Sequence, residues 1–145
     1  MINENKILKA DRGLFAFILL NAITFGLYNL YFIHSVAKDI NTTCFDDDRH
    51  TDGVVMFLIL TTLTLGLYSF LWYCFAANRI NHTFNKYYKG VCETSATNWI
   101  CWSIFGSLLF GLGPLIAQYH FIHAVNDLNS AYNIRYNYNK GTNNE

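Results

Sequence analysis

The chain has 145 residues, of which 52% are hydrophobic, 17% aromatic and only 14% charged, whereas a soluble domain usually carries about 25% charged residues. Ten Lys and Arg balance ten Asp and Glu, which excludes a nucleic-acid binder held by a broad basic surface, and the apolar content excludes a disordered chain. Its cysteines are too few and too unevenly spaced to frame a small secreted disulfide scaffold: Cys44, Cys74, Cys92 and Cys101.

A polar segment, residues 1–13, opens the chain and carries Lys6, Lys9 and Arg12 in front of an apolar run. This order is typical of a signal peptide, but no small-residue cleavage site follows, and the run continues through Tyr28. The run also recurs later in the chain. We therefore expect it to be part of the folded protein and not a removable leader.

Three apolar runs dominate the rest of the chain, and none of them contains Asp, Glu, Lys or Arg: Leu14–Val36, Val54–Ala77 and Trp99–Val125. Each exceeds the roughly 18 to 20 residues that a helix needs to cross a bilayer. In a soluble protein of this size three such runs would all be central helices with almost nothing to cover them. The sequence predicts an all-α integral membrane protein with three membrane segments.

The apolar runs belong to an internal repeat. A gapless shift by 40 residues aligns Leu14–Cys44 with Val54–Phe84, and Thr, Gly, Tyr and Asn positions match as well as apolar ones. A third, divergent copy runs through Gly111, and we expect it to need about three extra residues after its glycines. The predicted organisation is repeat 1 (14–44), an acidic loop (45–53), repeat 2 (54–90), repeat 3 (91–132) and a disordered Asn-rich tail (133–145).

The two close copies share the segments Thr24-Phe25-Gly26-Leu27-Tyr28 and Thr64-Leu65-Gly66-Leu67-Tyr68, each followed by aromatic residues. This pair resembles a family of small prokaryotic multi-pass membrane proteins of unknown function, in which a T-F-G-I-Y-x-x-Y-W motif is repeated. The resemblance covers residues 14–90 well and the third segment weakly, because Gly113-Pro114 replaces Gly-Leu-Tyr there. It implies an architecture and no particular chemistry.

Two interpretations of the repeated glycine remain open. Small residues at four-residue spacing could let helices pack closely, and Thr side chains or Pro114 could instead bend or break the chain at this level. The residues expected to pack or kink are Ala22, Gly26, Thr62, Gly66, Ser103, Ser107, Gly111 and Pro114.

The aromatic residues leave the path through the membrane open as well. They cluster just after the first two glycines, where a simple span would place them near mid-membrane and not at its edge. Re-entrant hairpins are therefore an alternative to the straight or kinked spans that the run lengths favour. For three spans, the distribution of Lys and Arg places the amino terminus in the cytoplasm by a margin of two charges.

At the end of the first run, the helical periodicity places Val36 and Ile40 on one side of the helix, and Lys38 and Asp39 on another.

Polar groups inside the apolar runs are candidates for a pathway or pocket at the repeat interface, or for hydrogen bonds between helices. They are Asn29, His34, Thr61, Thr64, Gln118, His120 and His123. His120 and His123 lie one turn apart and could bind haem or a metal with His34. Because no carboxylate or cysteine spacing completes such a site, we favour a polar seam and expect neither a metal nor a cofactor.

The loop from Asp46 to Asp52 is rich in Asp, but it lacks the Glu and the glycine spacing of a calcium loop, so a solvated connector is the better interpretation. Nucleophile, phosphate-loop and zinc motifs are missing, so an enzyme is not expected. The predicted function is a small membrane protein that acts by helix-helix assembly, as a homo-oligomer or as an accessory subunit of another membrane protein. The alternative is an oligomeric channel or transporter-like pathway for ions or small solutes.

Overall fold

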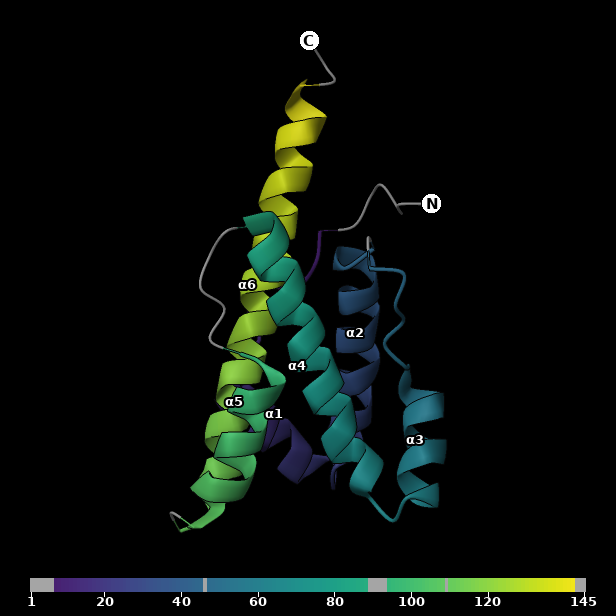
Figure 1. The fold of residues 1–145 in the computed structure, drawn as a ribbon, viewed down its shortest axis with the longest axis vertical. Helices are drawn as coiled ribbons and strands as arrows, with labels where there is room; N and C mark the ends of the chain where they lie inside the picture. The colour runs from purple at the N-terminus through teal and green to yellow at the C-terminus, as the bar shows by residue number, and fades with distance from the viewer. Residues whose placement is uncertain (1–6, 46, 89–93, 109, 143–145) are drawn as a thin grey trace.

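The computed structural model describes residues 7–45, 47–88, 94–108 and 110–142 (Figure 1). Over these ranges the protein is all-helical, as the apolar runs predicted. Its elements are α1 (Leu14–Ile23), α2 (Leu27–Thr43), α3 (Val54–Leu63), α4 (Leu67–Tyr88), α5 (Ala96–Ile100), a π-helical turn η1 (Cys101–Phe105), a 3-10 turn η2 (Gly106–Leu108) and α6 (Gly113–Thr142).

The elements form three helical hairpins. Each hairpin has a short arm that leads to a tight turn and a longer arm that returns from it: α1 with α2, α3 with α4, and α5-η1-η2 with α6. The three turns lie at the same end of the molecule, at the bottom of Figure 1, and α6 extends furthest from them. Each long apolar run of the sequence is thus folded back on itself. Within the described ranges, no helix is both long enough and apolar enough to cross a membrane.

The third hairpin follows the register of the other two without extra residues in its long arm. Gly26 and Asn41 are separated by 15 positions, and so are Gly66 and Asn81, and Gly111 and Asn126. The positions that become buried in the long arms match in the same register: 32/72/117, 33/73/118, 36/76/121, 37/77/122, 40/80/125 and 43/83/128. The expectation of about three additional residues after the glycines of the third copy was wrong. The extra length lies in the helices before the third turn: α4 has 22 residues against 17 in α2, and α5 begins 15 positions before Gly111, whereas α3 begins 12 positions before Gly66.

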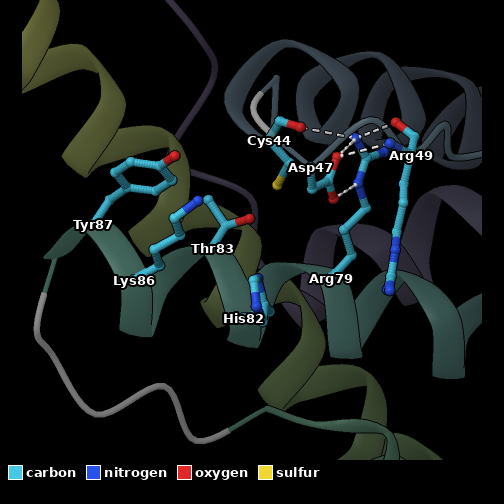
Figure 2. Close-up of a pocket in the computed structure, with 8 residues that line it drawn as sticks. All are labelled: Cys44, Asp47, Arg49, Arg79, His82, Thr83, Lys86 and Tyr87. Atoms are coloured by element: carbon cyan, nitrogen blue, oxygen red, sulfur yellow. Dashed lines mark hydrogen bonds and ion pairs between the residues drawn. The ribbon is translucent and has the colours of Figure 1, made fainter.

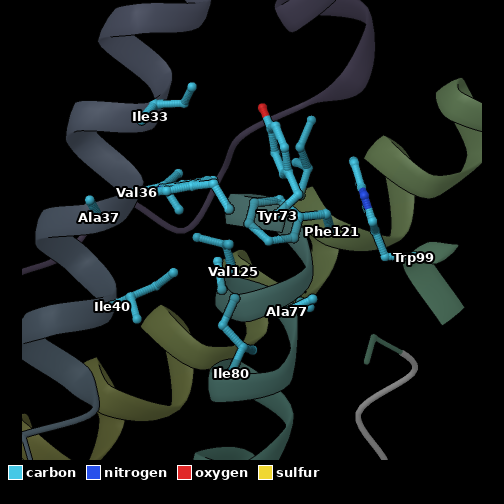
Figure 3. Packing of buried hydrophobic residues seen from close by; sticks show 14 of the residues in the cluster. Ile33, Val36, Ala37, Ile40, Tyr73, Ala77, Ile80, Trp99, Phe121 and Val125 are labelled. Carbon is cyan, nitrogen blue, oxygen red and sulfur yellow. The ribbon is translucent and has the colours of Figure 1, made fainter. Parts of the chain in front are cut away.

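The core lies between the three long arms and is rich in aromatic residues (Figure 3). Phe121 of α6 is fully buried, and its ring contacts those of Phe32 on α2, Trp72 and Tyr73 on α4, and Trp99 on α5. Edge-to-face contacts of this kind add to the free energy gained from burying the rings. Phe121 therefore joins all three hairpins in one core.

Asparagine side chains attach the segments that lead into the short arms. Asn41 of the first hairpin exchanges two hydrogen bonds with the backbone of Thr51, just before α3. Asn126, at the equivalent position of the third hairpin, exchanges two with the backbone of Arg12, just before α1. The third hairpin thus holds the segment that leads into the first hairpin, and the three units close into a ring.

Helix α6 continues through Thr142, where the sequence predicted a disordered tail from residue 133. Asn133 exchanges two hydrogen bonds with the backbone of Leu8, and Asn129 donates to the carbonyl of Lys9. Residues 8–12, which we call the amino-terminal strap, therefore lie along α6. Asn133, the first asparagine of the predicted tail, thus binds an extended segment, and such a contact leaves no apolar periodicity in the sequence.

Candidate functional site

The three turns share an uncommon backbone conformation. A bulky residue with positive φ precedes the turn glycine in each: Phe25 (51°), Leu65 (54°) and Phe110 (55°). The glycines that follow are also left-handed, at 89°, 95° and 75° for Gly26, Gly66 and Gly111. A left-handed conformation costs a non-glycine residue roughly 1–2 kcal/mol, because its Cβ approaches a carbonyl oxygen. The fold accepts this cost three times at equivalent positions.

Hydrogen bonds explain why the chain turns here. The amide of Gly26 donates to the carbonyl of Asn21 at 2.8 Å, which closes a Schellman-type helix end. The Thr24 hydroxyl donates to the carbonyl of Leu20 and accepts from the amide of Tyr28, so it links the end of α1 to the start of α2. The second turn repeats the three bonds with Gly66, Thr64 and Tyr68. The repeated Thr and Gly thus form a cap and a turn.

Large apolar side chains surround the turns and point to solvent. Phe25 and Leu65 are 97% exposed and Phe110 is 100% exposed. Their neighbours two positions away on both sides are exposed as well: Ile23, Leu27, Leu63, Leu67, Leu108 and Leu112. We call these nine residues the apolar tip.

Charged residues begin only at some distance from the apolar tip. The ten residues of α1 and of α3 rise about 15 Å at 1.5 Å per residue. Arg12 and Asp52 lie just before α1 and α3. The first charged residues of the long arms are Lys38, Arg79 and Asp127, at least 12 positions past the turn glycines. The apolar zone is therefore roughly 15–18 Å deep, by the same helical rise.

The turn glycines that were candidates for close packing lie in open space. A Cβ built on Gly26, Gly66 or Gly111 would meet nothing within 4 Å. The close backbone approach is elsewhere, where a Cβ on Gly113 would lie 2.2 Å from the carbonyl carbon of Gly106. The interpretation of the repeated glycine as a chain break therefore agrees with the structure. The Gly106–Gly113 approach was not predicted.

The other candidate packing residues also lie at or near the turns. Ala22 and Thr62 are exposed, and the Ser107 hydroxyl donates to the carbonyl of Ser103 within its own segment. Pro114 is in the first turn of α6, where proline is well tolerated because that amide has no helical partner, so it begins the helix and does not kink it.

The candidate polar residues of the apolar runs do not share one path. Asn29 accepts a hydrogen bond from the Tyr73 hydroxyl at 3.2 Å, and Gln118 lies near the same buried tyrosine. The remaining candidates are dispersed: His34, Thr64 and His123 are exposed, Thr61 has a buried hydroxyl without a partner among the described residues, and His120 is stacked on Trp102. Asn29 and Gln118 are thus the pair that the fold brings together.

A buried arginine organises the loop between the first two hairpins (Figure 2). Arg79 of α4 is only 6% exposed, and its Nε and Nη2 donate to the two carboxylate oxygens of Asp47 at 2.6 and 2.7 Å. Its other hydrogen bonds reach the Asn41 and Thr51 side chains and the carbonyls of Cys44 and Arg49. The five N–H groups of an arginine are all used in such an arrangement.

Burial raises the pKa of Asp47, but the hydrogen bonds from Arg79 and the nearby Arg49 backbone amide outweigh burial, and the net effect is a lowered pKa. Burial also raises the pKa of the neighbouring Cys44 thiol. The thiol is therefore protonated at neutral pH and is not poised for nucleophilic chemistry. The cluster fixes the loop.

A second buried ion pair lies at the matching level of the first hairpin. Arg12 donates to the Asp39 carboxylate at 2.6 Å, and Asn129 of α6 donates to the same oxygen. Asp39 occupies the position equivalent to Arg79. The pattern placed Asp39 on the polar side of its helix, away from Ile40, and that was wrong, because both residues are buried. Asp39 and Arg79 are charged residues among the positions that the repeat buries. This pattern is the sequence signal that could have revealed both ion pairs.

The acidic loop is organised by protein partners. Asp47 pairs with Arg79, and Asp52 accepts from the Tyr68 hydroxyl. Asp46 lies outside the described residues. In the part of the chain that the structure describes, no three His, Cys, Asp or Glu side chains gather as metal ligands.

Comparison with known proteins gives one match. The model of a family described as a domain of unknown function, DUF4234, matches residues 12–82. The matched segment takes in the first hairpin and most of the second, including both Thr-x-Gly-Leu-Tyr turns. No curated protein and no solved structure matches the chain.

Proposed function

We propose that this protein is an integral membrane protein that enters a lipid bilayer from one side, with the apolar tip of its three hairpins embedded in a single leaflet. The observation that carries the proposal is the apolar tip itself. Phe25, Leu65 and Phe110 occupy left-handed turn positions that would be filled at lower cost by Gly or Asn in water. A repeated, strained and fully exposed apolar residue gains free energy only where the surroundings are apolar.

The depth of the apolar zone supports the same proposal. A bilayer's hydrocarbon core is about 30 Å thick, so one leaflet contributes about 15 Å. The short arms α1 and α3 match that depth, and the first charged side chains then lie at the level of the lipid headgroups. Burial of one large apolar side chain yields roughly 1.5–3 kcal/mol, so Phe25, Leu65 and Phe110 together contribute about 5–9 kcal/mol to insertion.

The backbone of the turns is compatible with a lipid environment. A bilayer core offers no water to unpaired backbone groups, so turns within it must satisfy those groups internally. Thr24 and Thr64 supply such partners at the first two turns. The hairpins also put every charged connection on the same side of the membrane. By the positive-inside tendency we place that side, with the amino terminus, in the cytoplasm.

The two roles expected from the sequence differ in their support. A pathway has little support, because His34, Thr64 and His123 are exposed, whereas Asn29 is half-buried and Gln118 is buried. Assembly with a second copy or another membrane protein would use the exposed apolar faces of α1 and α3, where Phe15, Leu19, Val55 and Ile59 lie. Those faces are equally suited to lipid, which we take as their partner.

Sidedness labelling distinguishes hairpins from spans. His50 and Thr97 are both exposed, one before α3 and one in α5. Single cysteines H50C and T97C are placed in a parent in which Cys92 and Cys101 are serine, since Cys44 and Cys74 are buried. Each variant is treated with a membrane-impermeant maleimide in right-side-out and in inverted membrane vesicles. One-sided hairpins predict that both cysteines react from the same face.

Three complete spans predict the opposite result, because the loop at His50 and the linker before Trp99 would lie on opposite faces. Reaction of H50C and T97C from different faces would therefore exclude the hairpin arrangement. The parent provides the background labelling, and a third variant, L65C, should resist the reagent from both faces. Extraction of the protein from membranes by a carbonate wash would contradict its insertion into the bilayer.

A further inference from the structure

A surface cavity of about 350 Å³ lies between the loop that precedes α3 and the side of α4. Arg49, His50 and Asn78 form its polar wall, and Tyr68, Trp72 and Phe75 form its aromatic wall. The aromatic residues are nearer to the turn at Gly66 than the polar residues are, because they precede Asn78 on the same helix. The cavity thus changes from polar to apolar along the direction that leads to the apolar tip.

The polar wall offers side chains whose hydrogen-bonding groups are unused among the described residues, although the Arg49 charge also attracts the Asp47 carboxylate. Within the described ranges, the side chains of Arg49, His50 and Asn78 make no hydrogen bond, whereas every N–H of the adjacent Arg79 is used by the protein. In Figure 2 the Arg49 side chain runs away from the carboxylate of Asp47. An arginine and an imidazole side by side are suited to hold a phosphate.

The acidic residue that lines the cavity, Asp52, already has hydrogen-bond partners within the protein. Asp52 accepts a hydrogen bond from the Tyr68 hydroxyl, and its backbone carbonyl accepts one from the Trp72 indole N–H. These bonds direct Asp52 to the aromatic side of the cavity. The cation side, at Arg49 and His50, therefore remains open to an anion.

The level of the cavity suggests where that anion comes from. Gly53 is the N-cap residue of α3, so Arg49 and His50 lie just before the start of a short arm that rises about 15 Å from the turn. With the apolar tip at the middle of a bilayer, this is the level at which hydrocarbon ends and headgroup phosphates begin. Tyr68 and Phe75 lie below that level, beside the acyl chains.

We propose that this cavity binds one phospholipid, with Arg49 and His50 holding the headgroup phosphate and Tyr68 and Phe75 contacting the acyl chains. The inference rests on the proposed insertion of the hairpins into one leaflet.

The test uses the full chain in dodecyl maltoside, a detergent without phosphate, and counts bound phosphatidylglycerol by native mass spectrometry during titration. The test variant is R49Q/H50Q. The matched control is K38Q, because Lys38 is an exposed cation at the position of α2 equivalent to Asn78 and does not line this cavity. We expect one tightly bound lipid in the wild type and in K38Q, and about tenfold or more weaker binding in R49Q/H50Q, from the loss of charge-assisted hydrogen bonds.

Equal weakening by K38Q and R49Q/H50Q would overturn the site and indicate general attraction between cations and anionic lipid. Displacement of the lipid by inorganic phosphate at equal concentration would overturn a phospholipid as the ligand in favour of a soluble phosphate. The sidedness labelling of H50C and T97C separates this inference from the proposed function. Loss of selective lipid binding with both cysteines labelled from one face rejects the cavity alone, whereas labelling from different faces rejects the insertion.

Discussion

Replacement of the three turn residues by asparagine, F25N/L65N/F110N, should have opposite effects on membrane binding and on the local backbone. Each side chain is almost fully exposed, so its removal breaks no packing. Membrane insertion loses the burial of three large apolar groups, about 5–9 kcal/mol in total. Asparagine, however, tolerates the left-handed conformation better than phenylalanine or leucine does.

Flotation of the protein with liposomes on a density gradient measures the first effect. We expect the asparagine variant to shift strongly from the lipid layer to the bottom fraction. The control I7N/F45N/I134N removes three exposed apolar residues that do not belong to the apolar tip and should float as the wild type does. If the two triple variants float equally well, the apolar tip does not contact lipid, and the reasoning fails.

Chemical unfolding in mild detergent, followed by circular dichroism, measures the second effect. The comparison is with F25A/L65A/F110A, which also removes the large apolar groups but lacks the side-chain amide with which asparagine favours positive φ through local hydrogen bonds. We expect the asparagine variant to be the more stable by up to about 1 kcal/mol per position. Equal stability of the two variants would show that the turns carry no backbone strain.

Further predictions concern the buried contacts. R79M should lower the free energy of unfolding by about 3 kcal/mol in a denaturant titration, because it leaves the mostly buried Asp47 and several loop acceptors without their donor. The lowered pKa of Asp47 stabilises the fold fully above its unfolded pKa of about 3.9, and this contribution is lost as pH falls through the lower folded value. D47N should therefore flatten the acid limb of the stability curve, and an unchanged acid limb would contradict the assignment. G113A should destabilise more than G26A, because its Cβ meets backbone whereas G26A bears only about 1 kcal/mol of left-handed strain; equal melting temperatures would argue against the close approach. N126A should cost about 1–3 kcal/mol for two lost hydrogen bonds and speed hydrogen exchange in the amino-terminal strap, whereas unchanged exchange would mean that other contacts hold the strap.

The local features of this protein follow from its sequence. The apolar runs make helices, and the repeated Thr-x-Gly breaks them, because a left-handed glycine and a threonine that bonds to both helix ends favour a turn. The shift of 40 residues correctly related the first two hairpins. The repeat also placed the aromatic clusters just after the first two glycines. In the structure these glycines lie at the apolar tip.

The tertiary structure decided whether each apolar run forms one long helix or folds back as a hairpin. A run of more than 20 apolar residues is compatible with a span or with two shorter helices, and hydropathy alone does not distinguish them. The choice depends on contacts between residues far apart in the chain. Phe121 joins all three hairpins, and Asn126 of the third hairpin binds the backbone of Arg12, 114 positions earlier in the chain. Such pairs have no periodicity in the sequence, so the apolar content was evident from the amino acids, whereas its concentration at one end of the molecule came from the fold.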